Sequence, residues 1–319
     1  MQQCQGIPRS ADEEIRRVCS GGYRQRLRRA TRTHPAARTA AATHDRHRST
    51  VLATLRNLAP GSIVSHQSAA LLYRVPVELS LLDRVHVTRN RNHGGRITPT
   101  LAVHVAAVDT VAELAGLAVT TPARTVVDLA RTVPFEAAVV AGDALAREYG
   151  VTATDLTAEL HRAARRVGIG TARQVVAFLD PRSPGIGHSR SRVMLRRLGI
   201  PQPRSQGDVQ SHDRRRLGRV DFWFGDTGVV GVFDGHLRYG RAVHPGGDVV
   251  EALAREQSRE EALRRHGFQV VRWTWDELAD GTAAARIRAA LARAGRHRPQ
   301  GHIRPAELPA PRPLTLRPL

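Results

Sequence analysis

Two adjacent stretches rich in apolar residues, within residues 217–235, give the clearest structural signal in the chain and predict two neighbouring strands. Asp221 lies in the first strand, and Asp234 closes the second strand just before a glycine. A charged helix is predicted over residues 255–266, and a further strand follows over residues 268–273. This succession of strands and helices is typical of a mixed α/β (α+β) fold.

Residues 61–182 predict a second folded region, in which helices surround a strand pair. A helix with serine at its N-cap is expected over residues 65–73. Residues 84–88 and 101–105 alternate apolar and polar side chains, as half-buried strands do, and the loop over residues 90–95 suits a hairpin between them. Four further helices are predicted over residues 121–130, 135–149, 154–166 and 171–179.

By composition and patterning, the chain divides into four parts. Residues 1–60 are basic and poorly patterned, whereas residues 61–182 and 183–295 carry the periodic apolar positions of folded domains. The proline- and glycine-rich segment over residues 180–185 marks the boundary between these two domains. Residues 296–319 are rich in arginine and proline and have no apolar period, so we expect a flexible tail.

The charge of the chain is strongly positive, with a formal net charge of +20 and no lysine. GC-rich coding explains the choice of arginine over lysine, but it does not explain the excess of positive charge. Nucleic acid is therefore the expected partner, although an acidic protein would satisfy the same charge. The candidate phosphate contacts near the N-terminus are Arg24, Arg26, Arg28 and Arg29.

Cysteine content and hydropathy argue against export and membrane insertion. Cys4 and Cys19 form no metal-binding CxxC motif and are too few for a disulfide framework, which predicts a reducing cytoplasm. The N-terminus lacks the pattern of a signal peptide, and no apolar run approaches the roughly 20 residues that a membrane span needs. We therefore expect a cytoplasmic protein without a membrane partner, and no motif indicates a small-molecule cofactor.

The C-terminal domain resembles the Vsr-like family of restriction-endonuclease-fold domains, which occurs in many actinobacterial proteins. The resemblance implies an αβββαβ core and a metal-dependent nuclease site. It rests on residues 189–193, 219–222, 233–235, 259–264 and 267–275.

The middle domain resembles the AbiEi-type antitoxins of type IV toxin–antitoxin systems. The matching segments are residues 65–72 and 121–131. The resemblance implies a DNA-binding antitoxin with a toxin protein as a partner. Members of that family usually begin with a complete winged helix-turn-helix, but residues 1–60 are short and irregular and predict a truncated winged-helix region.

The nuclease resemblance implies a Mg²⁺ or Mn²⁺ site built from carboxylates, and this chain has lost part of that set. The strand aspartate is present as Asp221, and the second acid of the following pair is present as Asp234. The helix acid is replaced by His188 and the first acid of the pair by Val232. Because imidazole is a poor ligand for hard Mg²⁺, we expect metal binding to be weak or absent.

The remaining positions of the implied site are also altered. Gln257 stands where family members often carry a lysine, so it supplies no positive charge to the nucleophile. Arg259 is the candidate for stabilising negative charge in the transition state. The spacing of Glu256, Glu260 and Arg264 suits a solvated helix face with opposite charges four residues apart.

Three functions remain open from the sequence. The first is a duplex-DNA-binding protein similar to AbiEi-type antitoxins, with a catalytically impaired endonuclease-fold domain. The second is an active Mg²⁺- or Mn²⁺-dependent DNA endonuclease that works with Asp221, Asp234 and an arginine such as Arg259. The third is a protein-interaction module that neutralises a toxin. A fold by itself does not choose among them.

Overall fold

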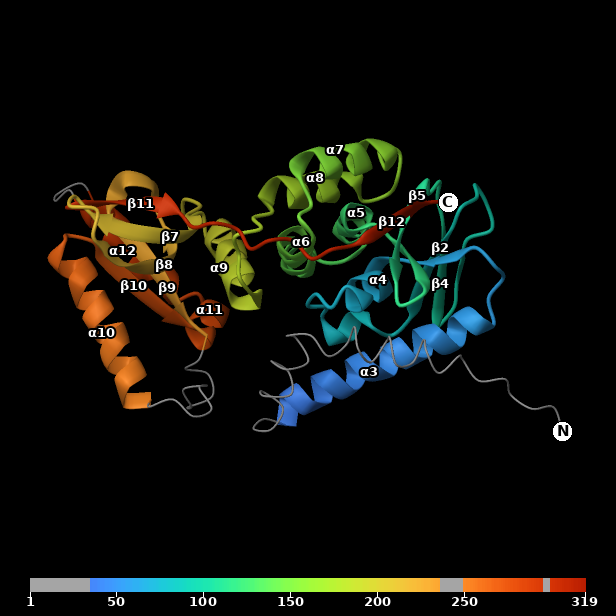
Figure 1. Ribbon diagram of the computed structural model, residues 1–319, viewed down its shortest axis with the longest axis horizontal. Coiled ribbons are helices and arrows are strands. Elements are labelled where there is room, and N and C mark those ends of the chain that lie inside the picture. Colours follow the sequence, from blue (N-terminus) through green and yellow to red (C-terminus); the bar gives the residue numbers. More distant parts are fainter. Residues whose placement is uncertain (1–34, 236–248, 295–298) are drawn as a thin grey trace. The chain divides into compact units, whose positions relative to one another are not determined.

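A computed structural model describes residues 35–235, 249–294 and 299–319 (Figure 1). The chain divides into two compact units. Unit 1 comprises residues 1–179 and 310–319, and unit 2 comprises residues 180–309. The first division lies beside the proline- and glycine-rich segment that marks a boundary in the sequence.

Unit 1 is a mixed unit of helices and one sheet, which fits the predicted α/β (α+β) class. Its helices are α3 (Pro35–Arg56), α4 (His66–Leu72), α5 (Pro122–Thr132), α6 (Phe135–Tyr149), α7 (Ala153–Arg162) and α8 (Ile169–Phe178), with a 3-10 turn at Leu79–Leu81. Its strands are β1 (Ser62–Val64), β2 (Val85–Arg89), β3 (Arg96–Ile97), β4 (Leu101–Val105), β5 (Thr110–Leu114), β6 (Leu117–Thr120) and β12 (Thr315–Pro318).

The strand order in the sheet of unit 1 is β12-β5-β6-β1-β2-β4-β3. The predicted hairpin between residues 84–88 and 101–105 is wrong, because β2 and β4 run parallel, with Val85 opposite Leu101. The turn chemistry around residues 90–95 instead leads into the short strand β3, which pairs antiparallel with β4. The chain thus makes its hairpin one strand later than the pattern suggested.

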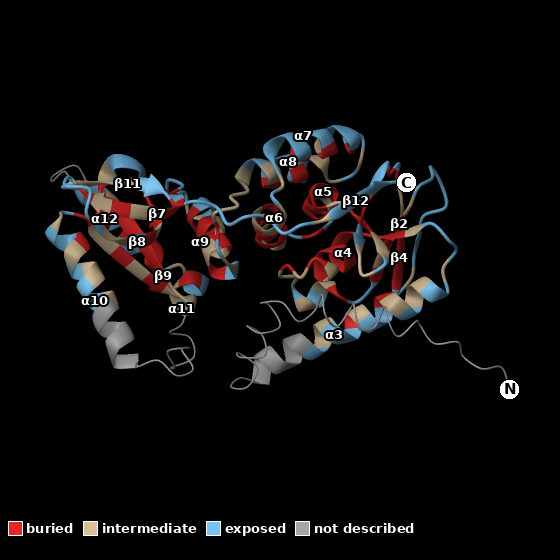
Figure 2. Cartoon of the chain, in the orientation of Figure 1, coloured by how far each residue is buried: buried red, intermediate tan, exposed pale blue. Residues whose placement is uncertain are grey.

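Helices α4 and α5 are buried over most of their length and form the core of unit 1 (Figure 2). α5 begins as predicted: the Thr121 side chain accepts a hydrogen bond from the backbone N–H of Arg124, and proline occupies the first turn. Tyr73, which ends α4, is fully buried and donates its hydroxyl proton to the Thr120 carbonyl at 2.7 Å. This bond fixes α4 to strand β6.

Unit 2 has the predicted order of one helix, three strands, one helix and one strand. Its helices are α9 (Ile186–Arg197), α10 (Val249–Arg265), α11 (Trp275–Asp280) and α12 (Ala283–Arg293), with a 3-10 turn at Gly225–Thr227. Its strands are β7 (Arg204–Ser211), β8 (Arg216–Trp223), β9 (Val229–Asp234), β10 (Gln269–Thr274) and β11 (Gly301–Pro305).

The sheet of unit 2 has the order β10-β9-β8-β7-β11, and only β10 and β9 pair in parallel. Along β9, Val229 and Phe233 join one apolar cluster, and Val230 joins another. Because alternate side chains of a strand point to opposite faces, the two clusters lie on opposite faces of the sheet.

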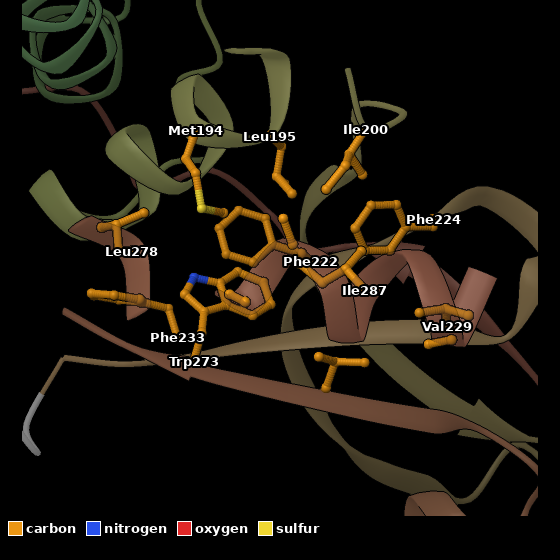
Figure 3. Packing of buried hydrophobic residues seen from close by; sticks show 14 residues of the cluster. Met194, Leu195, Ile200, Phe222, Phe224, Val229, Phe233, Trp273, Leu278 and Ile287 are labelled. Carbon is orange, nitrogen blue, oxygen red and sulfur yellow. The ribbon is translucent and has the colours of Figure 1, made fainter. Parts of the chain in front are cut away.

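The larger cluster of unit 2 packs helices α9, α11 and α12 against the sheet (Figure 3). Trp273 is fully buried at its centre, where its ring stacks on Phe222 at a centroid distance of 5.2 Å. The indole N–H of Trp273 donates to the Ser191 hydroxyl of α9 at 2.9 Å, so the polar end of this large side chain is satisfied. On the other face, Leu263 of α10 packs with Val230.

The expectation that residues 296–319 form a flexible tail is wrong for the described residues 299–319. β11 pairs antiparallel with β7 in unit 2, and β12 pairs antiparallel with β5 in unit 1. Backbone hydrogen bonding to exposed sheet edges holds these strands, and Ile303 of β11 also packs against the apolar cluster that contains Val230. Because the segment lacks a continuous apolar face, hydropathy did not reveal these strands.

No helix in the described ranges is long and apolar enough to cross a membrane. Two short helices, α11 and α12, follow β10 and are separated at Gly281, whose φ of 75° is in the left-handed region that glycine adopts readily.

Candidate functional site

Asp221 lies in β8 and has three hydrogen-bond partners. Its Oδ1 accepts from the Gln206 side-chain amide at 3.0 Å and lies 3.1 Å from Nε2 of His188. Its Oδ2 accepts from the backbone N–H of Phe233 at 2.9 Å. Burial by itself raises the pKa of the Asp221 carboxyl, but His188 and the two other donors outweigh it and hold the pKa below its ordinary value.

His188 approaches Asp221 from the N-terminal end of α9. The helix starts at Ile186, so His188 lies in its first turn. The imidazole packs against Phe222 and Phe233, with ring centroids 5.8 and 5.6 Å away. Gly187 permits this approach, because a Cβ there would lie 2.0 Å from the Phe233 ring. His188, which the nuclease resemblance places at the position of the helix acid, thus pairs with the strand aspartate Asp221.

Asp234, at the end of β9, is held by Arg272 from the parallel strand β10. The guanidinium donates to both carboxylate oxygens, from Nε to Oδ2 at 2.8 Å and from Nη2 to Oδ1 at 2.5 Å. Its third nitrogen, Nη1, donates to Glu256 at 2.9 Å and to Glu260 at 2.8 Å, both on α10. The hydrogen bonds with Asp234 raise the pKa of Arg272 above its ordinary value, so the side chain stays charged.

The α10 glutamates do not lie on a solvated helix face, as the spacing of charges suggested. Glu256 and Glu260 turn toward the sheet and meet Arg272, with side chains 30% and 16% exposed. Arg259 pairs with Glu256, and Arg264 pairs with Glu260, the latter as expected for residues four apart. Three carboxylates and three guanidiniums therefore balance around Arg272, and Arg259 contributes to this network.

Val232 and Gln257, the two other positions at which this chain departs from the nuclease pattern, lie in different environments. Val232 is 7% exposed and lies in register with Arg272 across the β9–β10 pair. Gln257 is exposed on α10. A carboxylate at position 232 would thus stand beside Arg272, whereas the side chain at position 257 points into solvent.

The residues of this site do not fit the Mg²⁺ or Mn²⁺ ion that the nuclease resemblance implies. Both oxygens of Asp234 are bound by a guanidinium, and both oxygens of Asp221 already accept hydrogen bonds. A hard cation needs several oxygen ligands with free lone pairs. In this structure the permanent cation beside Asp234 is the side chain of Arg272, which the sequence reading missed.

The N-terminal candidates for phosphate contact, Arg24, Arg26, Arg28 and Arg29, lie outside the described residues. Within the described part of unit 2, arginines gather at the turn between β7 and β8. Arg214, Arg215 and Arg216 are exposed there, and Arg219 follows on β8. Arg216 pairs with Asp208 at 2.8 Å, whereas the turn itself presents its positive charge to solvent.

The structure brings His66, His86 and His104 of unit 1 together, from α4, β2 and β4. One signal was available, because His86 and His104 each occupy a position within an expected strand. Parallel pairing of these strands, which the sequence did not predict, places them side by side.

Comparison with known proteins finds two distant relatives. The chain is 26% identical over 231 residues to the uncharacterized proteins MT2308 and Rv2248 of two Mycobacterium tuberculosis strains. Each match covers 71% of this chain and 80% of the relative. No family model and no solved structure matches the chain.

Proposed function

We propose that this protein binds duplex DNA and that its endonuclease-fold domain has lost catalysis, as in a protein similar to the AbiEi-type antitoxins. The observation that carries the proposal is the formal net charge of +20. Such an excess attracts a polyanion over long range and releases counterions from the phosphate backbone on binding.

The Arg272 network supports the loss of catalysis. Phosphodiester hydrolysis at a nuclease site of this kind needs a metal ion to polarise the phosphate and generate hydroxide. Arg272 instead pairs with Asp234 and two glutamates, and Asp221 is held by His188 and Gln206. A guanidinium does not generate hydroxide from water, so this arrangement supplies no substitute for the metal ion.

The exposed turn between β7 and β8 is the described part of the chain that best suits phosphate contact. It offers Arg214 and Arg215 on a rigid hairpin, with side chains open to solvent. Guanidinium forks of this kind bind phosphate oxygens and position a protein on DNA without reading its sequence.

The binding test is the affinity of the full chain for a fluorescent DNA duplex across a salt series. For about six phosphate contacts, affinity should fall roughly a thousandfold between about 50 and 200 mM salt. Arg214→Glu with Arg215→Glu should weaken binding and reduce the salt slope. The matched control reverses two exposed arginines of unit 1, Arg56→Glu with Arg173→Glu. A flat salt response, or no binding at low salt, rejects the proposal.

A second experiment addresses the N-terminal arginines. Replacing Arg24, Arg26, Arg28 and Arg29 together with glutamine should also lower the salt slope if this segment contacts phosphate. If neither these substitutions nor the hairpin reversals change the slope, the attraction arises from the net charge alone.

Cleavage is tested on supercoiled plasmid with Mg²⁺ and, separately, with Mn²⁺. We expect no nicking by the unmodified protein. Robust metal-dependent cleavage that Asp221→Asn abolishes would show that the protein is an active endonuclease and would overturn the proposed loss of catalysis, while leaving the binding result intact.

A further inference from the structure

Three histidines of unit 1 converge from three different elements. One ligand nitrogen from each of His66, His86 and His104 lies within 4.8 Å of the others, and this is the one such group of three in the described ranges. The His66 and His104 rings lie 3.8 Å apart between centroids, and the His86 ring lies 5.3 Å from that of His104.

His66 is held in an uncommon conformation with an unused nitrogen. It begins α4 with a φ of 52°, which non-glycine residues rarely adopt. Its Nδ1 lies 3.0 Å from the Ser65 hydroxyl, and its Nε2 is buried without a hydrogen-bond partner. The side chain is 1% exposed, so water does not satisfy this nitrogen. Buried polar atoms without partners are uncommon and point to a missing ligand.

A second unpartnered polar atom lies on the adjacent strand. The Thr88 hydroxyl is buried without a partner, and Thr88 stands opposite His104 in the β2–β4 register. His86 and Thr88 are two residues apart on β2, so their side chains share one face of the sheet. The same face therefore holds two imidazoles and one unsatisfied hydroxyl.

The contact between the two strand histidines is close to the geometry of shared metal ligation. Nδ1 of His86 and Nε2 of His104 lie 3.0 Å apart. Two nitrogens bound at about 2.0–2.1 Å to one tetrahedral zinc ion lie roughly 3.3–3.4 Å apart. A small widening of this pair and a rotation of the His66 ring would bring three nitrogens around one ion.

We propose that His66, His86 and His104 form a binding site for a transition metal ion of the zinc class. Three imidazoles suit Zn²⁺ or Co²⁺ and are poor ligands for Mg²⁺ or Ca²⁺. The Ser65 hydroxyl orients His66 from behind, as partners of metal-bound histidines commonly do. Thr88 is placed to hydrogen-bond a water at the fourth position.

The protonation state of the cluster agrees with this assignment. Burial lowers the pKa of all three imidazoles, that of His86 to about 3, so each is neutral and has a lone pair at neutral pH. The surrounding charges are mixed, since Asp128 favours a cation near His66 while Arg131 opposes it. We therefore expect weaker binding than at a zinc site enclosed by thiolates.

The test uses the full chain after chelator treatment, titrated with Co²⁺ and then Zn²⁺. To exclude thiol ligands, all proteins carry Cys4→Ser and Cys19→Ser. We expect visible absorption bands of tetrahedral Co²⁺, displaced by one equivalent of Zn²⁺. His86→Gln and His104→Gln, each at a partly exposed position, should weaken binding at least tenfold. His161→Gln, at an exposed position of α7, is the matched control.

Circular dichroism establishes that each variant is folded before titration. The proposal is overturned if the parent protein shows neither the Co²⁺ bands nor an increase in melting temperature with excess Zn²⁺. It is equally overturned if His86→Gln and His104→Gln bind Co²⁺ as tightly as His161→Gln does.

Discussion

Arg272 of β10 donates two hydrogen bonds, at 2.8 and 2.5 Å, to the carboxylate of Asp234 on the neighbouring parallel strand β9. Bidentate pairs of this kind are strong and fix the orientation of both groups. The acid that the nuclease resemblance assigns to a metal ion is thereby neutralised within the protein. Glu256 and Glu260 share the same arginine, so one side chain takes the place that a divalent ion would otherwise fill.

Removing the positive charge of Arg272 should destabilise unit 2 and make its stability respond to a divalent metal ion. Arg272→Gln leaves Asp234 without its ion-pair partner and leaves Glu256 and Glu260 with one arginine each, and we expect a loss of about 3 kcal/mol in unfolding free energy at neutral pH. Mn²⁺ should recover part of that loss. The measurement is urea unfolding with and without Mn²⁺. Arg216→Gln, which breaks the more exposed pair with Asp208, is the control and should cost under about 1 kcal/mol. Equal stabilities of the two variants would contradict this role of Arg272.

A carboxylate placed at position 232 should not by itself create a metal site. The carboxylate introduced by Val232→Glu would stand in register with Arg272 and pair with it. We expect no gain in Mn²⁺ binding by calorimetry for this single variant. A gain is expected for the double variant Val232→Glu with Arg272→Gln, because Asp234 and the new carboxylate then lack the arginine that would compete with Mn²⁺. Tight Mn²⁺ binding by Val232→Glu alone would show that Arg272 yields readily.

Truncation after Pro309 should weaken unit 1. The deletion removes the β12–β5 ladder and the ion pair between Arg312 and Glu148. At about 1 kcal/mol for each of roughly three hydrogen bonds, the unfolding free energy should fall by about 3 kcal/mol. Chemical denaturation of the truncated and full chains measures this. Glu307→Ala, at an exposed position, should change nothing. An unchanged stability of the truncated chain would show that β12 docks without contributing.

Asp128 should make the unfolding free energy of unit 1 fall as the pH becomes acidic. Burial alone would raise the pKa of this carboxyl, but its partners, among them the paired Arg124 and Arg131, outweigh burial and lower the pKa to about 2. A lowered pKa gives stability that is present above the unfolded value, near 4, and is lost as the pH falls toward 2. Asp128→Asn should therefore be destabilising at pH 7, and its deficit relative to the parent should shrink below about pH 4. Denaturant midpoints at several pH values test this, and a deficit independent of pH would count against it.

Gly187 should be intolerant of any side chain. A Cβ there would lie 2.0 Å from Phe233, so Gly187→Ala must displace α9 from the sheet and should cost about 1–3 kcal/mol. It should also loosen the contact between His188 and Asp221. Gly185→Ala is a close control, because no atom lies within 4 Å of its Cβ and its backbone is extended. Thermal melts compare the two, and similar melting temperatures would disprove the steric argument.

The sequence predicted the elements whose signals are local. The helix over residues 135–149, the capped start of α5 and the strands at Asp221 and Asp234 follow from periodicity and capping. The pairing of the strands was harder to predict. β2 and β4 run parallel because of the path that the chain takes between them, and no residue type in either strand encodes that direction.

The candidate site shows the same division. Asp221, Asp234 and His188 were predicted as positions of the site, but Gln206 and Arg272, which hold the two aspartates, were not. Arg272 was hidden within a strand pattern, and Glu256 and Glu260 resembled an exposed helix face. Only the placement of α10 against β10 reveals that these charges meet.

Strand β12 also sets an order for biosynthesis. Its partner β5 is translated about 200 residues earlier, and the whole of unit 2 is made in between. At about 5–20 residues per second, the outer edge of β5 waits roughly 10–40 s on the ribosome before its neighbour emerges. During that interval the nascent chain presents an unpaired strand edge, which other chains can join. Unit 1 must therefore begin to fold while the outer edge of β5 is unpaired. Its sheet can be completed only after unit 2 has been synthesised.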